Sequence, residues 1–178
     1  RVSTKGMRSS AHGIHARTSY EPKSPIDIWN SGDMWVSTTG YDSRASGIYA
    51  KTRRDSPLDI WNSGNIWVST TGDNSRAVGI HARADSPIDI HNSGDMWVST
   101  KGGYSNAVGI YADTDSEKNP IDIWNSGDMW VSTKGGYSDA FGIWAFTVET
   151  GSPLDIRNSG NMWVSTTGDN TRAYGIRA

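Results

Sequence analysis

The chain alternates short runs of apolar and polar residues, and the same alternation returns along its whole length. In its first complete form, residues 26–29 (Ile-Asp-Ile-Trp) alternate, residues 30–33 (Asn-Ser-Gly-Asp) supply turn formers, and residues 34–38 (Met-Trp-Val-Ser-Thr) alternate again. A polar, glycine-containing turn then precedes residues 47–50 (Gly-Ile-Tyr-Ala). Alternation with a period of two is typical of β-strands. The pattern predicts three short strands per unit and an all-β protein, since helical apolar spacing does not occur.

The unit begins at a proline and recurs every 30 to 33 residues. A repeat of this length in fixed phase predicts a parallel β-solenoid, in which each unit is one coil stacked on the last. We interpret residues 1–178 as a single solenoid of about five and two-thirds coils, with repeats at 1–24 (partial), 25–56, 57–86, 87–119, 120–152 and 153–178. Because the chain opens in mid-repeat, we expect it to be a piece of a longer array.

The differences in repeat length are confined to one segment of the unit, between the third strand and the next proline. Loops tolerate insertions, whereas packed strands do not. We therefore expect exposed loops at residues 17–24, 51–56, 83–86, 113–119 and 146–152.

Comparison of the coils separates interior from surface positions. Positions equivalent to Ile28 hold only aliphatic residues, and Val36 and Ile48 recur unchanged in all six copies. These residues are expected to line the core. Their neighbours along each strand should face outward, and the Trp29 and Tyr49 positions are replaced by histidine or arginine in some coils, as suits a solvated face.

The outward aromatic columns are the sharpest functional feature of the sequence, because flat exposed apolar surfaces often mark contact sites. They either stack only on one another and stiffen the rod, or they bind a sugar, a partner chain or a neighbouring solenoid. The candidate binding or assembly surface comprises Trp29, Trp35, Trp61, Trp67, Trp97, Trp124, Trp130, Trp163, Tyr49, Tyr111 and Trp144.

Two further columns are expected to be structural. Asparagine follows the first strand in every complete coil, where stacked amides can bond to one another and to the turn backbone. This ladder comprises Asn30, Asn62, Asn92, Asn125 and Asn158. A second corner repeats a hydroxyl residue at Ser43, Ser75, Ser105, Ser138 and Thr171.

Composition narrows the function classes. The chain has no cysteine, which excludes disulfides and thiolate metal sites, and its net charge of −2 offers no case for binding nucleic acid or an anionic membrane. No apolar run is long enough to span a bilayer.

We expect no metal and no cofactor, because the four histidines lack ligand spacing. The column of Asp27, Asp59, Asp89, Asp122 and Asp155 is interpreted as a solvated acidic stripe.

Three segments of the repeat resemble the passenger repeats of autotransporter proteins from Gram-negative bacteria. They are the Ile-Asp-Ile-x-Asn-Ser-Gly-Asp, Ser-Thr-Thr-Gly-Asp-Asn-Ser and Gly-Ile-Tyr-Ala or Gly-Ile-His-Ala segments, which together cover essentially the whole chain. The resemblance implies a right-handed parallel β-helix, displayed extracellularly on the cell surface and often adhesive. The chain departs from that pattern in its density of tryptophan, and it contains neither a translocation barrel nor a signal peptide.

The resulting functional hypothesis is a non-enzymatic structural or adhesive extracellular stalk, without catalytic residues, that stacks on further coils of a parent chain or associates end to end or laterally. One alternative is a module that binds a host glycan or receptor through the aromatic columns. Another is a designed or consensus scaffold with no natural ligand. A polysaccharide-processing enzyme ranks last, because no coil carries a break in the repeat. An ice-binding face is disfavoured by the bulky indoles beside the Ser-Thr rows.

Overall fold

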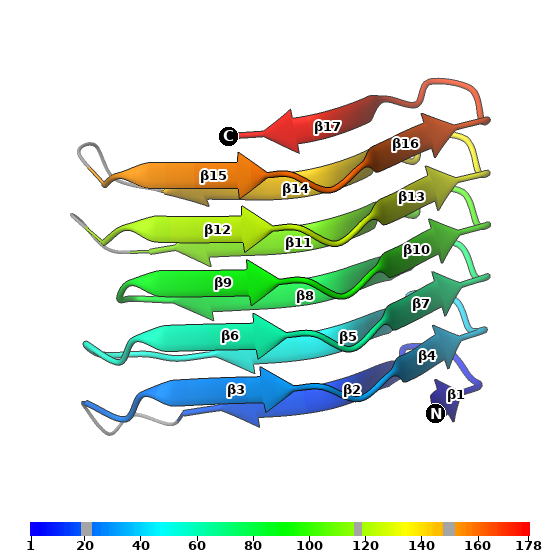
Figure 1. Ribbon diagram of the computed structural model, residues 1–178. Helices are drawn as coiled ribbons and strands as arrows, with labels where there is room; N and C mark the ends of the chain where they lie inside the picture. The colour runs from blue at the N-terminus through cyan, green and yellow to red at the C-terminus, as the bar shows by residue number, and fades with distance from the viewer. Residues whose placement is uncertain (19–22, 116–118, 148–151) are drawn as a thin grey trace.

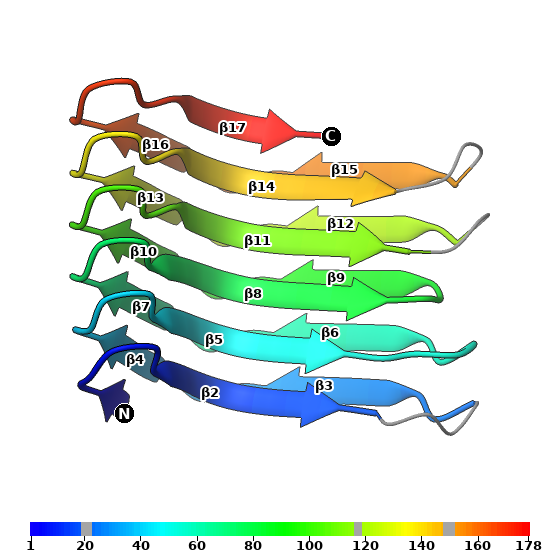
Figure 2. The same cartoon turned by 180° about the vertical axis from the view of Figure 1, so that it is seen from behind.

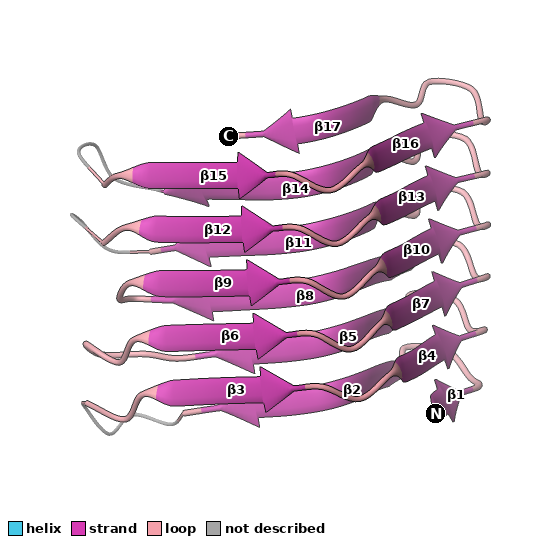
Figure 3. Ribbon diagram, in the orientation of Figure 1, coloured by secondary structure: helices cyan, strands magenta, loops and turns pink. Residues whose placement is uncertain are grey.

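The protein is a parallel β-solenoid. The computed structural model describes residues 1–18, 23–115, 119–147 and 152–178, and every regular element within these ranges is a β-strand (Figure 3). The strands form three parallel sheets, each of which extends along the solenoid axis from coil to coil (Figure 1). The expected all-β solenoid with three strands per coil is therefore confirmed.

Each sheet takes one strand from every coil. Sheet A contains β1 (Val2–Thr4), β4 (Met34–Thr38), β7 (Ile66–Thr70), β10 (Met96–Thr100), β13 (Met129–Thr133) and β16 (Met162–Thr166). Sheet B contains β2 (Ser10–Arg17), β5 (Arg44–Lys51), β8 (Arg76–Ala84), β11 (Ala107–Thr114), β14 (Ala140–Thr147) and β17 (Ala173–Arg177). Sheet C contains β3 (Ile26–Asn30), β6 (Leu58–Asn62), β9 (Ile88–Asn92), β12 (Ile121–Asn125) and β15 (Leu154–Asn158).

The solenoid is right-handed. In Figure 1 the strands of sheet C run from left to right at the front, and in Figure 2, seen from behind, those of sheet B also run from left to right. The chain thus circles while it rises from the N-terminus at the bottom to the C-terminus at the top. This rotation and rise are those of a right-handed helix, as expected from the resemblance.

Neighbouring coils pair in register, so that equivalent residues lie directly above one another. Trp97 is paired with Trp130, for example, and Asn30 with Asn62. Registry gathers the aliphatic residues of all three sheets into one core, in which Ile48 is fully buried and Val36 is 2% exposed. The predicted division between interior and surface is confirmed for these positions.

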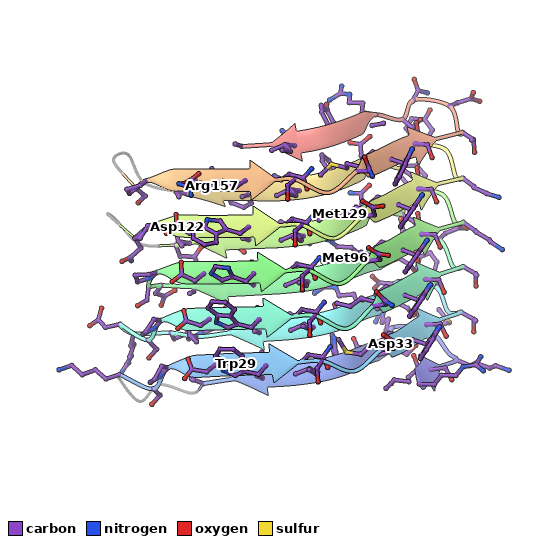
Figure 4. All side chains as sticks on the ribbon, in the orientation of Figure 1. Trp29, Asp33, Met96, Asp122, Met129 and Arg157 are labelled. Atoms are coloured by element: carbon purple, nitrogen blue, oxygen red, sulfur yellow. The ribbon has the colours of Figure 1, made fainter. Side chains whose placement is uncertain are left out.

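A row of glycines in sheet B allows sheets A and B to pack closely. A Cβ atom built on Gly79 would lie 2.6 Å from the carbonyl oxygen of Gly109 and 2.7 Å from the sulfur of Met96, both too close. Met96 lies on β10 of sheet A and is labelled in Figure 4. The methionine column thus fills the space that the missing side chains leave, because protein interiors are close-packed.

The predicted boundaries of the third strand and of the loops are wrong. The strand expected over residues 47–50 extends over Arg44–Lys51, and the equivalent strand β8 reaches Ala84. The first one or two residues of each variable segment therefore belong to a strand, and several of the residues that follow, including Thr52, Ser56 and Ser86, are buried rather than exposed. Pairing with the coils above and below continues the strands beyond the alternating residues. The parts of the expected loops at residues 19–22, 116–118 and 148–151 lie outside the described residues.

Candidate functional site at the asparagine corner

An open groove runs along the solenoid at the corner where sheet C turns into sheet A. Its volume is about 1070 Å³, and it crosses all five coils that contribute a strand to sheet C. One row of its lining is formed by the Trp29 column and another by the Asn-Ser corner. The lining residues in the first coil are Trp29, Asn30 and Ser31, and the equivalent residues of the next four coils, together with Ile156, complete it.

The asparagine ladder holds this corner in shape. The Nδ2 of Asn62 donates to the carbonyl oxygen of Gly64 and to Oδ1 of Asn92, each at 2.7 Å, and Asn92 repeats both bonds toward Gly94 and Asn125. Every amide in the middle of the ladder is buried. The predicted ladder is confirmed, and it fixes the backbone from which the groove residues project.

The second ladder is confirmed as well. The backbone N–H of Ser75 donates to the Oγ of Ser105 at 3.0 Å, and the Oγ of Ser75 donates to the carbonyl oxygen of Gly40 at 3.1 Å. Ser43 and Ser138 occupy the equivalent buried positions. These bonds satisfy turn groups that a tight bend would otherwise leave unpaired.

The Trp29 column forms the aromatic wall of the groove. Trp29 is 73% exposed, and its ring stacks on that of Trp61 with centroids 5.0 Å apart and planes within 4°. Trp61 stacks on His91 in the same way, at 3.8 Å and 5°. Trp61 has a ring on both faces and so presents mainly its edge to the solvent, whereas Trp29 has a ring partner on one face only.

Trp124 breaks this stack. Its ring lies 4.6 Å from that of His91 at an angle of 77°, and since the three preceding rings are nearly parallel, it is Trp124 that is turned. The Cζ atom of Arg157, in the next coil, lies 5.3 Å from the centroid of the Trp124 ring. Trp29 and Arg157 mark the two ends of the column in Figure 4. Trp124 therefore offers the groove a ring that is not part of the parallel stack.

The Trp35 column lies on sheet A and does not line the groove. Its five indoles form an unbroken stack with centroids 4.6 to 4.8 Å apart and planes within 8°. Trp35 and Trp163 at its ends are exposed, whereas the three between them are half-buried. The predicted stacking is confirmed, and mutual stacking accounts for most of the ring surface of this column. It comprises Trp35, Trp67, Trp97, Trp130 and Trp163.

The Tyr49 column belongs to sheet B, on the other side of the molecule from the groove (Figure 2). Tyr49, Tyr111 and Trp144 are half-buried rather than fully solvated. Tyr111 and Trp144 pack against a small apolar cluster of Val78, Val108 and Phe141. This cluster was not predicted from the sequence, although the change from Ser46 to valine and then phenylalanine along one column was a visible signal.

The aspartate column lies on the outer face of sheet C and is closely spaced, as predicted. Burial raises the pKa of Asp89, and the neighbouring Asp59 and Asp122 carboxylates raise it further. The pKa of Asp59 is raised in the same way, by burial and then by Asp27. In the described part of the chain, no three histidine, aspartate or glutamate side chains come together in a group that could hold a metal ion.

The described residues also include no helix of the length and apolarity that a membrane span requires. Comparisons with protein-family models, with curated proteins and with solved structures found no match.

Proposed function

We propose that this protein is a non-enzymatic adhesive rod of an extracellular surface protein, of the autotransporter passenger type, and that the groove at the asparagine corner binds an extended carbohydrate chain. The rod itself is the structural part of the proposal. A right-handed parallel solenoid built from near-identical coils is the scaffold that the resemblance implies. The adhesive part depends on the groove.

The observation that carries the adhesive function is the repeating chemistry of the groove. Each coil adds one side chain of the Trp29 column and one exposed serine hydroxyl to the lining. Ligand sites are typically concave and mostly apolar, with a few placed polar groups. A sugar ring has an apolar face of C–H groups and a rim of hydroxyls, so it matches an aromatic ring beside hydroxyl groups. The Asn and Ser rows repeat unchanged along five coils, beside a column of three tryptophans, one histidine and one arginine, and such a repeating groove suits a polymer of repeating units.

The residues that line the groove also favour glycan binding without hydrolysis. Glycoside hydrolysis ordinarily requires two carboxyl groups on either side of the scissile bond. None of the residues that line the groove is an aspartate or a glutamate. Its only ionisable residues are His91 and Arg157, which do not supply such a pair. The proposed role is therefore to hold a glycan and not to cleave it.

The test uses Trp124, the ring outside the parallel stack. Soluble cello-, chito- and pectic oligosaccharides are titrated into the protein, with tryptophan fluorescence and calorimetry as readouts. At least one of them is expected to bind, and Trp124→Ala is expected to weaken that binding roughly tenfold, because truncation of a central interface tryptophan commonly costs more than 1 kcal/mol.

Trp97→Ala is the matched control, since Trp97 occupies the sheet A stack outside the groove and has ring neighbours on both sides. It should leave glycan affinity unchanged. Equal losses in the two variants, or no binding across the panel, would contradict the carbohydrate proposal. The surface location is tested separately: an antibody against the chain should label intact source cells, and labelling only after permeabilisation would count against it.

A further inference from the structure

A second hollow lies on the outer face of sheet B, across the N-terminal coils. Its volume is about 170 Å³, and it is formed by β2, β5 and β8. The outer face of sheet B is seen from the front in Figure 2, on the opposite side from the strands of sheet C. No carboxylate lines the hollow, and its basic residues are His12, His15, Arg17, Arg44, Arg76 and His81.

The positive charges in this hollow are close together. Arg44 and Arg76 are directly paired in the register of β5 and β8, where like charges destabilise a sheet. Neither arginine forms a salt bridge with a carboxylate in the described ranges of the chain. Arg83, at the other end of the same strand β8, pairs with Asp113 and Asp115, neither of which lines the hollow.

Two histidines of the hollow have lowered pKa values. Burial, followed by the positive charges of Arg76 and Arg44, lowers the pKa of His81 to about 3. The pKa of His12 is lowered by burial, by His15 and by Arg44. Protonation of these rings is disfavoured first by burial and then by the neighbouring cations, and a bound anion would supply a counter-charge inside the hollow.

Several polar atoms in the hollow also lack partners. The Nε and Nη2 atoms of Arg76 are buried without a hydrogen bond, and so is Nδ1 of His12. The Arg76 guanidinium is held in place by the ring of Tyr111, whose centroid lies 4.4 Å from Cζ. Nε and one Nη nitrogen form the edge of a guanidinium that binds two oxygens of an oxyanion at once. Arg44, the register partner of Arg76, is exposed, and the exposed His15 also lines the hollow.

We infer that this hollow binds a tetrahedral oxyanion, the sulfate or phosphate ester group of a larger ligand, between Arg44, Arg76 and the histidines. Such a group has enough acceptor oxygens to meet donors from several strands. It would offset the repulsion between the paired arginines. The site lies on a different face from the glycan groove and does not depend on it.

Calorimetric titration of the 178-residue chain with sodium sulfate and with sodium phosphate, against sodium chloride at matched ionic strength, tests the inference. Sulfate, phosphate or both should bind at one site, and binding should shift the NMR resonances of the His12 ring. Arg44→Gln is expected to weaken binding about tenfold, because it removes a charge-assisted hydrogen bond. Arg76→Gln should have a similar effect.

Arg172→Gln is the control, since Arg172 precedes β17 at the repeat position equivalent to Arg44. It should leave binding unchanged. Preference for sulfate would indicate a sulfated polysaccharide and preference for phosphate a phosphorylated ligand, and both support the site. Heats no larger than those of chloride overturn it. So does native affinity in Arg44→Gln, an exposed substitution that is not expected to affect folding.

Discussion

At the scale of single residues, the asparagine ladder has the strictest hydrogen-bonding requirements, because its central amides are buried. Asn92 donates to Gly94 and Asn125 and accepts from Asn62, and all three amides are buried. Asn92→Ala removes these bonds and leaves groups of its neighbours unsatisfied, each at a cost of about 1–3 kcal/mol. We expect a loss of several kcal/mol in the free energy of unfolding, measured by chemical denaturation.

Asn30→Ala provides the comparison for this prediction. Asn30 ends the ladder and is only half-buried, and in the described residues it has a ladder partner on one side alone. Its substitution should cost clearly less than that of Asn92. If the two variants were equally stable, the ladder would not be the source of the stability that we assign to it.

His81 makes the protein sensitive to acid. Its pKa in the folded protein is about 3, because it is buried among cations, whereas a histidine in the unfolded chain titrates near 6.5. Between these values the unfolded chain binds a proton that the folded protein does not, so stability falls as the pH falls below 6.5. The loss from this residue is up to about 2 kcal/mol by pH 5.

His81→Tyr should reduce this acid sensitivity, because tyrosine occupies the same position in the coils on either side, at Tyr49 and Tyr111. The measurement is the difference in Tm between pH 7.5 and pH 5 in the variant and in the native chain. A smaller difference in the variant is expected. An unchanged difference would show that other groups cause the acid sensitivity.

At the scale of elements, the glycine row determines how closely sheets A and B pack. Gly79→Ala places a Cβ atom 2.6 Å from a backbone oxygen of β11 that cannot move without disturbing the sheet. We expect a loss of about 1–3 kcal/mol, the usual cost of overpacking a core. Gly103→Ala is the control, since the nearest atom to its Cβ would be 3.6 Å away, an ordinary contact. Equal stability of the two variants would argue against close packing at the glycine row.

At the scale of the whole molecule, the rod presents two different proposed binding surfaces on opposite sides, and strand edges at the two end coils. At one end, β15, β16 and β17 each pair with a single neighbouring strand, and Ile176 is 47% exposed. Unpaired edges are templates for further pairing.

We therefore expect end-to-end association, seen as a sedimentation coefficient that rises with protein concentration. Ile176→Lys should reduce this association, because it places a charge on the exposed edge strand. Arg177→Lys, which conserves the charge of the adjacent residue, should not. A single monomeric species at every concentration would contradict the prediction.

The repeat, the three strands and the division between core and surface could all be predicted from the amino-acid sequence. Because the coils stack in register, equivalent residues occupy equivalent environments. The residue types found at one repeat position therefore indicate whether that position is buried. Ile48 and Val36 in the core and the stacked asparagines at the corner were predictable for this reason.

Features that depend on contacts between columns became visible only in the folded structure. It showed that Trp124 leaves the stack that Trp29, Trp61 and His91 continue, since ring orientation depends on the neighbours above and below. It also placed Arg44 and Arg76 beside His12 around one hollow. These residues differ from coil to coil, and a repeat pattern describes what the coils share. The role of a position that differs between coils depends on the side chains that surround it in the folded protein.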